Sequence, residues 1–255
     1  MEATKNNLTN IGFRLKRKAK QIEYKLKLRS LKIRNHLSGK IKNKHNIILI
    51  SIDTLRADHL SCYGYRRKTS PNIDAFADKS LVFTNAISTS SWTVPAHASM
   101  FTGLYPSRHG LIQSPQPGKI PETAETLAEI LGKAGYFTAG FHGGGYLSPY
   151  FGFNRGFDIY SSKGSRIEHN LHNCLSWINR RRKDRFFLFL HGSNCHVPLS
   201  PPKEFDIYST GINAEYNTDR RSMYSWEKPK TNEELEYIIA KYDGEIKYMD
   251  HLIGK

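Results

Sequence analysis

The sequence of 255 residues contains 38% hydrophobic and 12% aromatic residues, a globular composition that is long enough to bury a sizeable core. Its formal net charge of +15 is concentrated at the start, because residues 1–45 hold 14 Lys or Arg against 2 Glu. Since the remainder is close to balance, the composition argues against a uniformly basic nucleic-acid-binding domain and predicts a globular domain over 46–255 behind a basic extension.

The cysteine pattern and the absence of long apolar runs bear on the compartment. Three cysteines form no CxxC pair and leave an odd count, which argues against a disulfide framework and fits a reducing compartment. No apolar run approaches the roughly 20 residues of a membrane span, and no apolar segment of a signal peptide follows the basic start. We therefore expect a cytoplasmic protein.

The basic extension carries a periodic apolar stripe. Two interpretations stay open: an amphipathic helix on an anionic membrane surface or a partner, or a solvated extension that contacts nothing in particular. Nucleic-acid binding is disfavoured because only two aromatic residues occur there, Phe13 and Tyr24. The stripe consists of residues at steps of four and seven: Ile11, Leu15, Ile22, Leu26, Ile33 and Leu37.

The body of the chain alternates strand and helix patterns, which predicts an α/β fold with a mostly parallel sheet flanked by helices. A capping box of Thr231 and Glu234 begins the last helix. Residues 200–230, rich in Pro, Tyr, Ser and Asn, predict a long excursion from the sheet. The expected strands are 46–53, 81–88, 136–141 and 185–192, and the expected helices are 70–80, 123–135, 166–183 and 231–253.

Two polar residues fall where ligands gather in such folds. Asp53 ends the apolar run "NIILISID", and it either binds a ligand at a strand end or caps the next turn. Thr93 lies just before a helix with Pro95 in its first turn and Gly103 as its C-cap. Backbone N–H groups there favour an anion, so Thr93 is either a nucleophile toward a phosphate or sulfate ester or an ordinary cap.

Four ordered segments together carry a family resemblance. They are "ILISIDTLRADHLSCYGY", "TSPNIDAFADKSLVFTNAIS", "TVPAHASMFTGLYPSRHG" and "FGFNRGFD". With "FFLFLHGSNCHVPLSPP" and "YDGEIKYMDHLIG", they resemble the amino-terminal part of the sulfatase family, within the alkaline-phosphatase superfamily. The resemblance runs from about Asn46 to the end of the sequence.

This resemblance implies roles for particular residues. It implies that Asp53 is the first metal-binding aspartate and that Thr93, followed by Pro95, stands at the nucleophile position and also contacts the metal. It implies that His196 lies near the substrate as a proton donor or as a ligand for the ester oxyanion. His191 and His142 are weaker candidates. The implied cofactor is one divalent cation, Mg, Mn, Ca or Zn, and the implied substrates are sulfate or phosphate esters.

Three departures from the family pattern change the expected chemistry. Thr93 replaces the cysteine that sulfatases convert to formylglycine, so the implied nucleophile is a plain hydroxyl. His97 replaces an arginine, which removes a permanent positive charge beside the nucleophile but leaves a group that hydrogen-bonds an anion. Thr54 stands where many sulfatases carry a second aspartate, which leaves the implied metal site poorer in carboxylates.

The end of the sequence sets the last expectation. Family members complete the metal site with an Asp-His or Asp-Asn pair on a later strand, whereas Asp250 and His251 lie inside a helical pattern and predict a solvated helix face. We therefore expect a fold incomplete at its C-terminus, as in a fragment. The expected function is a metal-dependent hydrolase or transferase, and the alternative is a non-catalytic relative whose basic extension binds a membrane surface or partner.

Overall fold

The computed structural model describes residues 45–112, 118–214, 216–219, 229 and 231–255. The apolar stripe of the basic extension lies outside these residues, so its predicted helix and membrane contact stay predictions. In the described part of the chain, no helix has both the length and the apolar character needed to cross a membrane.

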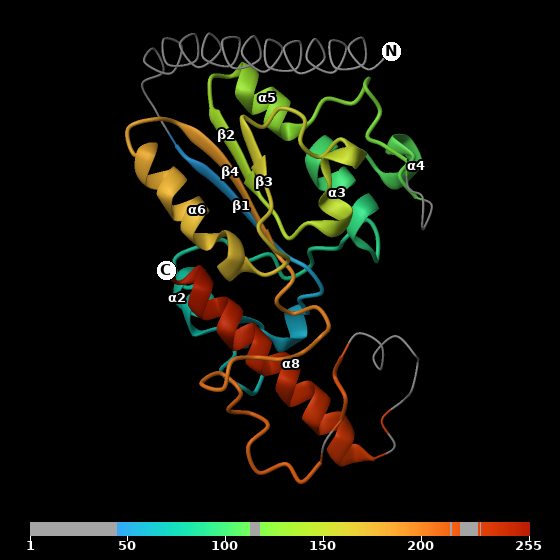
Figure 1. Cartoon of the computed structure of the whole chain (residues 1–255), viewed down its shortest axis with the longest axis vertical. Helices are drawn as coiled ribbons and strands as arrows, with labels where there is room; N and C mark the ends of the chain where they lie inside the picture. Colours follow the sequence, from blue (N-terminus) through green and yellow to red (C-terminus); the bar gives the residue numbers. More distant parts are fainter. Residues whose placement is uncertain (1–44, 113–117, 215, 220–228, 230) are drawn as a thin grey trace, which may run out of the picture.

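A parallel four-stranded sheet forms the centre of the fold (Figure 1), which confirms the predicted α/β class. Every neighbouring pair runs parallel, in the order β1-β4-β2-β3. The strand β4, apolar except for His191, is buried along its whole length, as expected for an internal strand covered on both faces. The strands are β1 (Ile47–Ile52), β2 (Phe137–Phe141), β3 (Ile159–Ser161), which the sequence analysis missed, and β4 (Phe186–Gly192).

Helices cover the two faces of the sheet, and the sheet separates the core into two clusters, one on each face (Figure 1). On one face, Trp177 of α6 packs with Leu188 and Leu190, while Phe101 of α3 packs on Phe189 from the other. The helices are α2 (Pro71–Ala77), α3 (Thr93–Thr102), α4 (Pro106–His109), α5 (Leu127–Lys133), α6 (Ile167–Arg180) and α8 (Asn232–Ile253). Short 3₁₀ helices are η1 (Ala57–His59), η2 (Ser61–Tyr63), η3 (Gly145–Leu147) and η4 (Pro149–Phe151).

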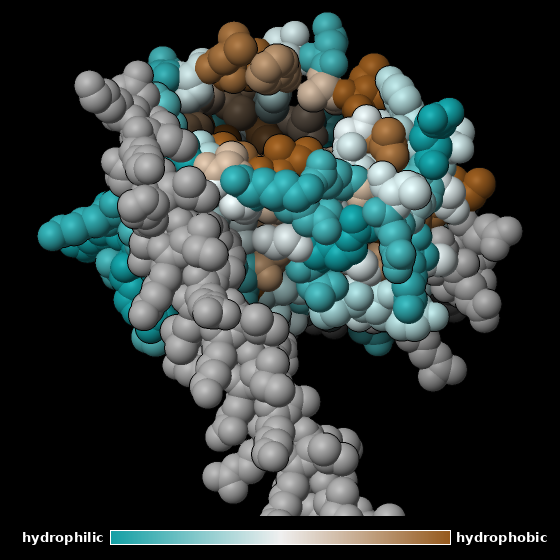
Figure 2. Space-filling model, turned by 90° about the horizontal axis from the view of Figure 1, so that it is seen from above, coloured by the Kyte–Doolittle hydropathy of each residue, from teal (hydrophilic) through white to brown (hydrophobic). Residues whose placement is uncertain are grey.

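The strand predicted at 81–88 is not formed. Leu81 and Phe83 of this segment are 80% and 67% exposed, and the segment pairs with no strand among the described residues. Its apolar pattern fits a strand, but a strand also needs a partner for its backbone N–H and C=O groups. The edge strand β1 is similarly uncovered, with Ile48 51% and Ile50 40% exposed. Figure 2 shows apolar side chains gathered around a hollow on the face seen from above.

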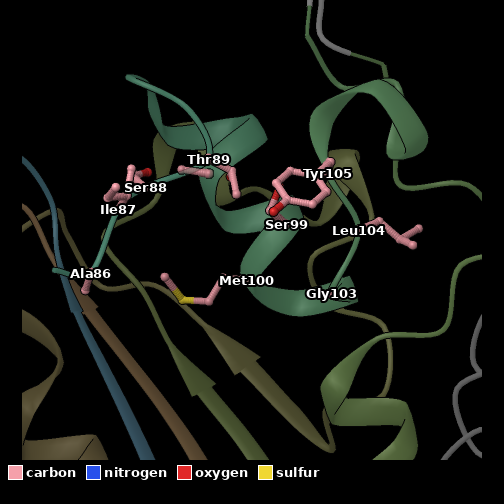
Figure 3. Close-up of a pocket in the computed structure, with 10 residues that line it drawn as sticks. Ala86, Ile87, Ser88, Thr89, Ser99, Met100, Gly103, Leu104 and Tyr105 are labelled. Carbon is pink, nitrogen blue, oxygen red and sulfur yellow. The ribbon is translucent and has the colours of Figure 1, made fainter. Parts of the chain in front are cut away.

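A mostly apolar hollow of about 480 Å³ lies between residues 86–89 and α3 (Figure 3). Met100 and Tyr105, 42% and 70% exposed, belong to its lining together with Ile87. Its lining shares no residue with the cavity that contains Asp53 and Thr93.

The long helix α8 packs against the segment that follows β1. The predicted capping box is confirmed, since Thr231 accepts from the Glu234 N–H while the Glu234 side chain accepts from the Thr231 N–H. The prediction of a solvated face at Asp250 is wrong. Asp250 is 1% exposed and accepts hydrogen bonds from the backbone N–H groups of Asn72 and Ile73, at 3.0 and 2.8 Å. Its carboxylate satisfies the free N–H groups at the start of α2, a role that periodicity alone does not reveal.

Candidate active site

Asp53 follows the last residue of β1, at the carboxyl end of the sheet. Its backbone N–H donates to the carbonyl of Gly192 at the end of β4, at 3.0 Å, so the sheet ladder fixes its position. The turn beyond it contains Thr54 at φ 59°, a left-handed conformation that β-branched residues rarely adopt. The chain therefore leaves the sheet sharply at Asp53, and the carboxylate stays at the strand end.

Thr93 is the first residue of α3, and its hydroxyl faces Asp53. The N-cap residue is Trp92, whose backbone is extended and whose side chain makes no capping hydrogen bond. The Thr93 Oγ1 donates to Asp53 Oδ2 at 3.3 Å, a contact across 40 residues of sequence. Local sequence pattern left two roles open for Thr93, nucleophile or helix cap. In the structure its hydroxyl points toward the Asp53 carboxylate.

A cavity of about 450 Å³ joins Asp53 and Thr93 to other candidate residues. His196 lines it, with Nδ1 3.0 Å from the carbonyl of Val197, so this nitrogen carries a proton. His191 also lines it. The remaining lining comes from loops at the carboxyl ends of the strands: Trp92, Gly143, Gly144, Gly145, Tyr146, Ser165, Arg166, Ser193, Val197 and Pro198.

His97 is placed beside Thr93 but is not among the residues that line this cavity. It is 4% exposed, with Nδ1 2.8 Å from the Thr93 carbonyl and Nε2 2.9 Å from the Ser51 hydroxyl. Because a carbonyl only accepts, Nδ1 carries the proton and Nε2 accepts from Ser51. Burial lowers the pKa of His97, so the ring is neutral near pH 7. Through these two bonds, the His97 ring connects the start of α3 to β1.

Two further histidines face the glycine run after β2. The Gly143 N–H donates to His191 Nδ1 at 3.2 Å, and the Gly144 N–H donates to His142 Nδ1 at 3.1 Å. Burial lowers the pKa of His191 to about 3, with the neighbouring His97 and His142 contributing, and that of His142 to about 4. Both rings are therefore neutral, and their second nitrogens carry the proton.

Arg166 is a cavity residue that sequence reasoning missed. Its guanidinium forms two bonds with the fully buried Glu245, at 3.0 and 2.8 Å, and a third with Glu168 at 2.6 Å. Burial raises the pKa of Glu245, while the bonds from Arg166 oppose that shift. The only sequence signal was a charged residue inside each of two helical patterns, so pairing across 79 positions could not be read from it.

The pair Asp53 and Thr93 offers a divalent cation two of its ligands. A carboxylate and a hydroxyl oxygen, 3.3 Å apart at the cavity wall, are hard donors of the kind that Mg, Mn and Ca prefer and that Zn accepts. Among the described residues, no group of three or more His, Cys, Asp and Glu side chains is arranged to hold a metal ion. The pair fits part of a coordination shell, and the remaining ligands would come from elsewhere.

A parallel α/β fold that brings a hydroxyl and a carboxylate together at its strand ends matches known proteins. The sequence model of the sulfatase family covers residues 45–255, and the chain belongs to this family. An arylsulfatase from Clostridium perfringens is 26% identical over 283 residues, which cover 83% of this chain and 58% of that protein.

Solved structures share the fold at lower identity. The C-terminal periplasmic domain of EcEptC from Escherichia coli, in complex with Zn, superposes with a TM-score of 0.62 at 17% identity, over 84% of this chain and 58% of that one. The corresponding domain of the phosphoethanolamine transferase EptC from Campylobacter jejuni gives 0.59 at 20% identity, over 83% and 62%. The chain thus spans 58–62% of the length of these three proteins.

Proposed function

We propose that the chain carries the nucleophile side of an active site that hydrolyses or transfers sulfate or phosphate esters. The observation that carries this proposal is the Thr93 hydroxyl, which donates to Asp53 at 3.3 Å on the wall of a 450 Å³ cavity. Family membership supports an ester substrate. Because the fold is shared with a phosphoethanolamine transferase, the proposal includes group transfer as well as hydrolysis.

Thr93 acts as the nucleophile in this proposal. Its hydrogen bond to Asp53 turns the oxygen lone pairs away from the carboxylate and toward the cavity. As the bond from Oγ1 to sulfur or phosphorus forms and the bond to the ester oxygen breaks, the hydroxyl proton passes to Asp53, and the imidazolium form of His196 gives its Nε2 proton to the departing oxygen. Water or an acceptor hydroxyl then attacks the sulfur or phosphorus and gives its proton to His196, while Thr93 Oγ1 leaves and takes back the proton held by Asp53.

A divalent cation held by Asp53 and Thr93 would supply positive charge that lowers the pKa of the hydroxyl and neutralises the ester oxygens. The other residues position this pair. His97 holds the carbonyl of Thr93 on β1 through Ser51, and the ladder bond to Gly192 holds Asp53. His97 is therefore proposed as a positioning residue rather than as a group that touches substrate.

The test compares the wild type with Thr93→Ala and Asp53→Asn in assays with an aryl sulfate, an aryl phosphate and an aryl phosphodiester, each with Mg, Mn, Ca or Zn. Thr102→Ala is the matched control, because Thr102 lies at the other end of α3 and its hydroxyl donates to the Ala98 carbonyl. We expect the wild type to turn over one of the esters and to form a covalent adduct that mass spectrometry detects. Thr93→Ala should lose both the turnover and the adduct, while the control retains both. Folded wild-type protein that turns over none of the three esters would refute the proposal.

A second proposal concerns the basic extension. Its 14 Lys or Arg against 2 Glu in residues 1–45 support attraction to an anionic membrane surface. Sedimentation with anionic and neutral vesicles tests it, with a variant that lacks residues 1–45 as the comparison. Equal binding of both forms to anionic vesicles would rule the proposal out.

A further inference from the structure

The turn that follows Asp53 is held in a conformation that its sequence disfavours. Among the described residues, Thr54 is the one non-glycine residue with positive φ, at 59°. A β-branched side chain crowds the backbone there, so such residues persist only where surrounding contacts hold them. The Thr54 hydroxyl donates to the carbonyl of Asp53 at 2.6 Å, which ties the strained residue to the candidate metal ligand.

The surrounding contact comes from Tyr242 of α8, which is 188 positions away in the sequence. Its hydroxyl donates to the Thr54 carbonyl at 2.7 Å and accepts from the Arg56 N–H at 2.8 Å. One hydroxyl group therefore bridges both sides of the turn. Because a phenol has a single proton, these two bonds fix its orientation.

The helix that supplies Tyr242 is itself anchored to the same segment. The next residue, Asp243, is fully buried and accepts from His59, Tyr65 and Arg67, each at 2.7 Å. The hydroxyl of Tyr242 thus acts from a fixed point, and not from a helix free to follow the turn.

We propose that Tyr242 is a positioning residue: it holds Thr54 in the left-handed region and so directs the Asp53 carboxylate toward Thr93. Asp53 is then fixed from both sides, by the ladder bond from its N–H to Gly192 and by the bridged turn beyond it. The significance for catalysis rests on the proposed function, whereas the backbone effect does not.

The test uses Tyr242→Phe, which removes the hydroxyl and keeps the ring. The matched control is Tyr208→Phe, which removes a hydroxyl that donates to the Lys68 carbonyl at 2.7 Å. The first readout needs neither metal nor activity: NMR gives the three-bond coupling that reports φ of Thr54, and hydrogen exchange gives the protection of the Arg56 amide. We expect Tyr242→Phe to change the coupling and lower the protection at least tenfold, with no such change in the control.

The second readout is Mn²⁺ affinity of the full chain by calorimetry. We expect Tyr242→Phe to weaken it by roughly tenfold, as partners that orient a ligand do. Thr54→Gly separates positioning from general stability, because glycine adopts positive φ without strain. We compare the drop in the logarithm of Mn²⁺ affinity that Tyr242→Phe causes in two backgrounds. In the Thr54→Gly background this drop should be less than half of the drop in the wild type.

The outcomes separate the two proposals. An unchanged Thr54 coupling in Tyr242→Phe overturns the positioning role, and so does a loss of Mn²⁺ affinity that Thr54→Gly fails to reduce. If the wild type binds no Mn²⁺, coupling and amide exchange decide alone. If Tyr242→Phe shifts the coupling but the wild type turns over no ester, the proposed function fails and the positioning role stands.

Discussion

Asp243 places a fully buried carboxylate between α8 and the segment that follows β1. It is fully buried and accepts three hydrogen bonds at 2.7 Å, from His59 at one oxygen and from Tyr65 and Arg67 at the other. Asp243→Asn keeps the shape, but one oxygen becomes an NH₂ group whose hydrogens meet these donors. At least one donor therefore loses its acceptor, and the Arg67 charge loses its buried partner.

The magnitude follows from what remains around Arg67. Breaking a buried ion pair by removing one partner costs about 3–5 kcal/mol. Arg67 keeps a second contact with Glu236 at 3.1 Å, but that carboxylate is 44% exposed and screened by water, which places the expectation at the lower end. We expect the free energy of unfolding to fall by about 3 kcal/mol, roughly a hundredfold in the unfolding equilibrium.

Urea denaturation at pH 7, followed by fluorescence and circular dichroism, measures this change. The control is Asp58→Asn, which breaks the pair between Arg56 and Asp58, both side chains 64% exposed, and should cost about 0–1 kcal/mol. The reasoning would be refuted if Asp243→Asn lowered the free energy of unfolding by less than 1 kcal/mol while the slope of that free energy against urea concentration stayed unchanged.

Three further predictions concern acid stability, the sheet edge and the start of α2. The lowered pKa values of His142 and His191, about 4 and about 3 against an ordinary 6.5, mean that the unfolded chain binds more protons between these limits. Stability should therefore be complete above pH 6.5 and fall as the pH drops, by about 1.4 kcal/mol per pH unit for each histidine; denaturation midpoints from pH 7 to pH 4.5 measure it, and a flat profile would contradict it. The exposed edge strand β1 should lead the wild type to self-associate at high concentration, and Ile50→Lys, at a position 40% exposed, should lower that association in sedimentation velocity without loss of stability; a wild type that stays monomeric, or a variant that associates equally, would contradict this. Asp250→Ala should destabilise the chain by about 2–4 kcal/mol, because charge-assisted bonds to the N–H groups of Asn72 and Ile73 are lost, and urea denaturation showing less than 1 kcal/mol would exclude that role.

The sequence predicted those parts of the fold that depend on local pattern. The apolar run of β4 and the amphipathic helices at 166–183 and 231–253 were found because burial and period coincide there. Two general rules, that ligands gather at strand ends and that helix N-termini attract anions, singled out Asp53 and Thr93 but left each with a capping alternative. Their meeting at one site was expected from the family resemblance.

The parts that sequence reasoning missed depend on partners far away in the chain. The segment at 81–88 has a strand's composition but pairs with no strand among the described residues, which no local pattern reports. Asp250 lies on a helix with charged residues on several sides, and only the position of α2 makes its side the buried one. The role of His97 beside the substrate stays a prediction, but no local pattern reports that its Nε2 lies 2.9 Å from the Ser51 hydroxyl on the adjacent strand.

The contacts between α8 and the segment after β1 also set an order of events during synthesis. Tyr242, Asp243 and Asp250 bond to residues 176 to 188 positions earlier, so the turn beside Asp53 is made long before the groups that hold it. On a ribosome, the strands and the first helices can assemble while this turn still lacks its hydrogen-bond partners. The candidate site should therefore be among the last regions to become ordered, and a nascent chain that stops before residue 231 should hold Asp53 and Thr93 without their final geometry.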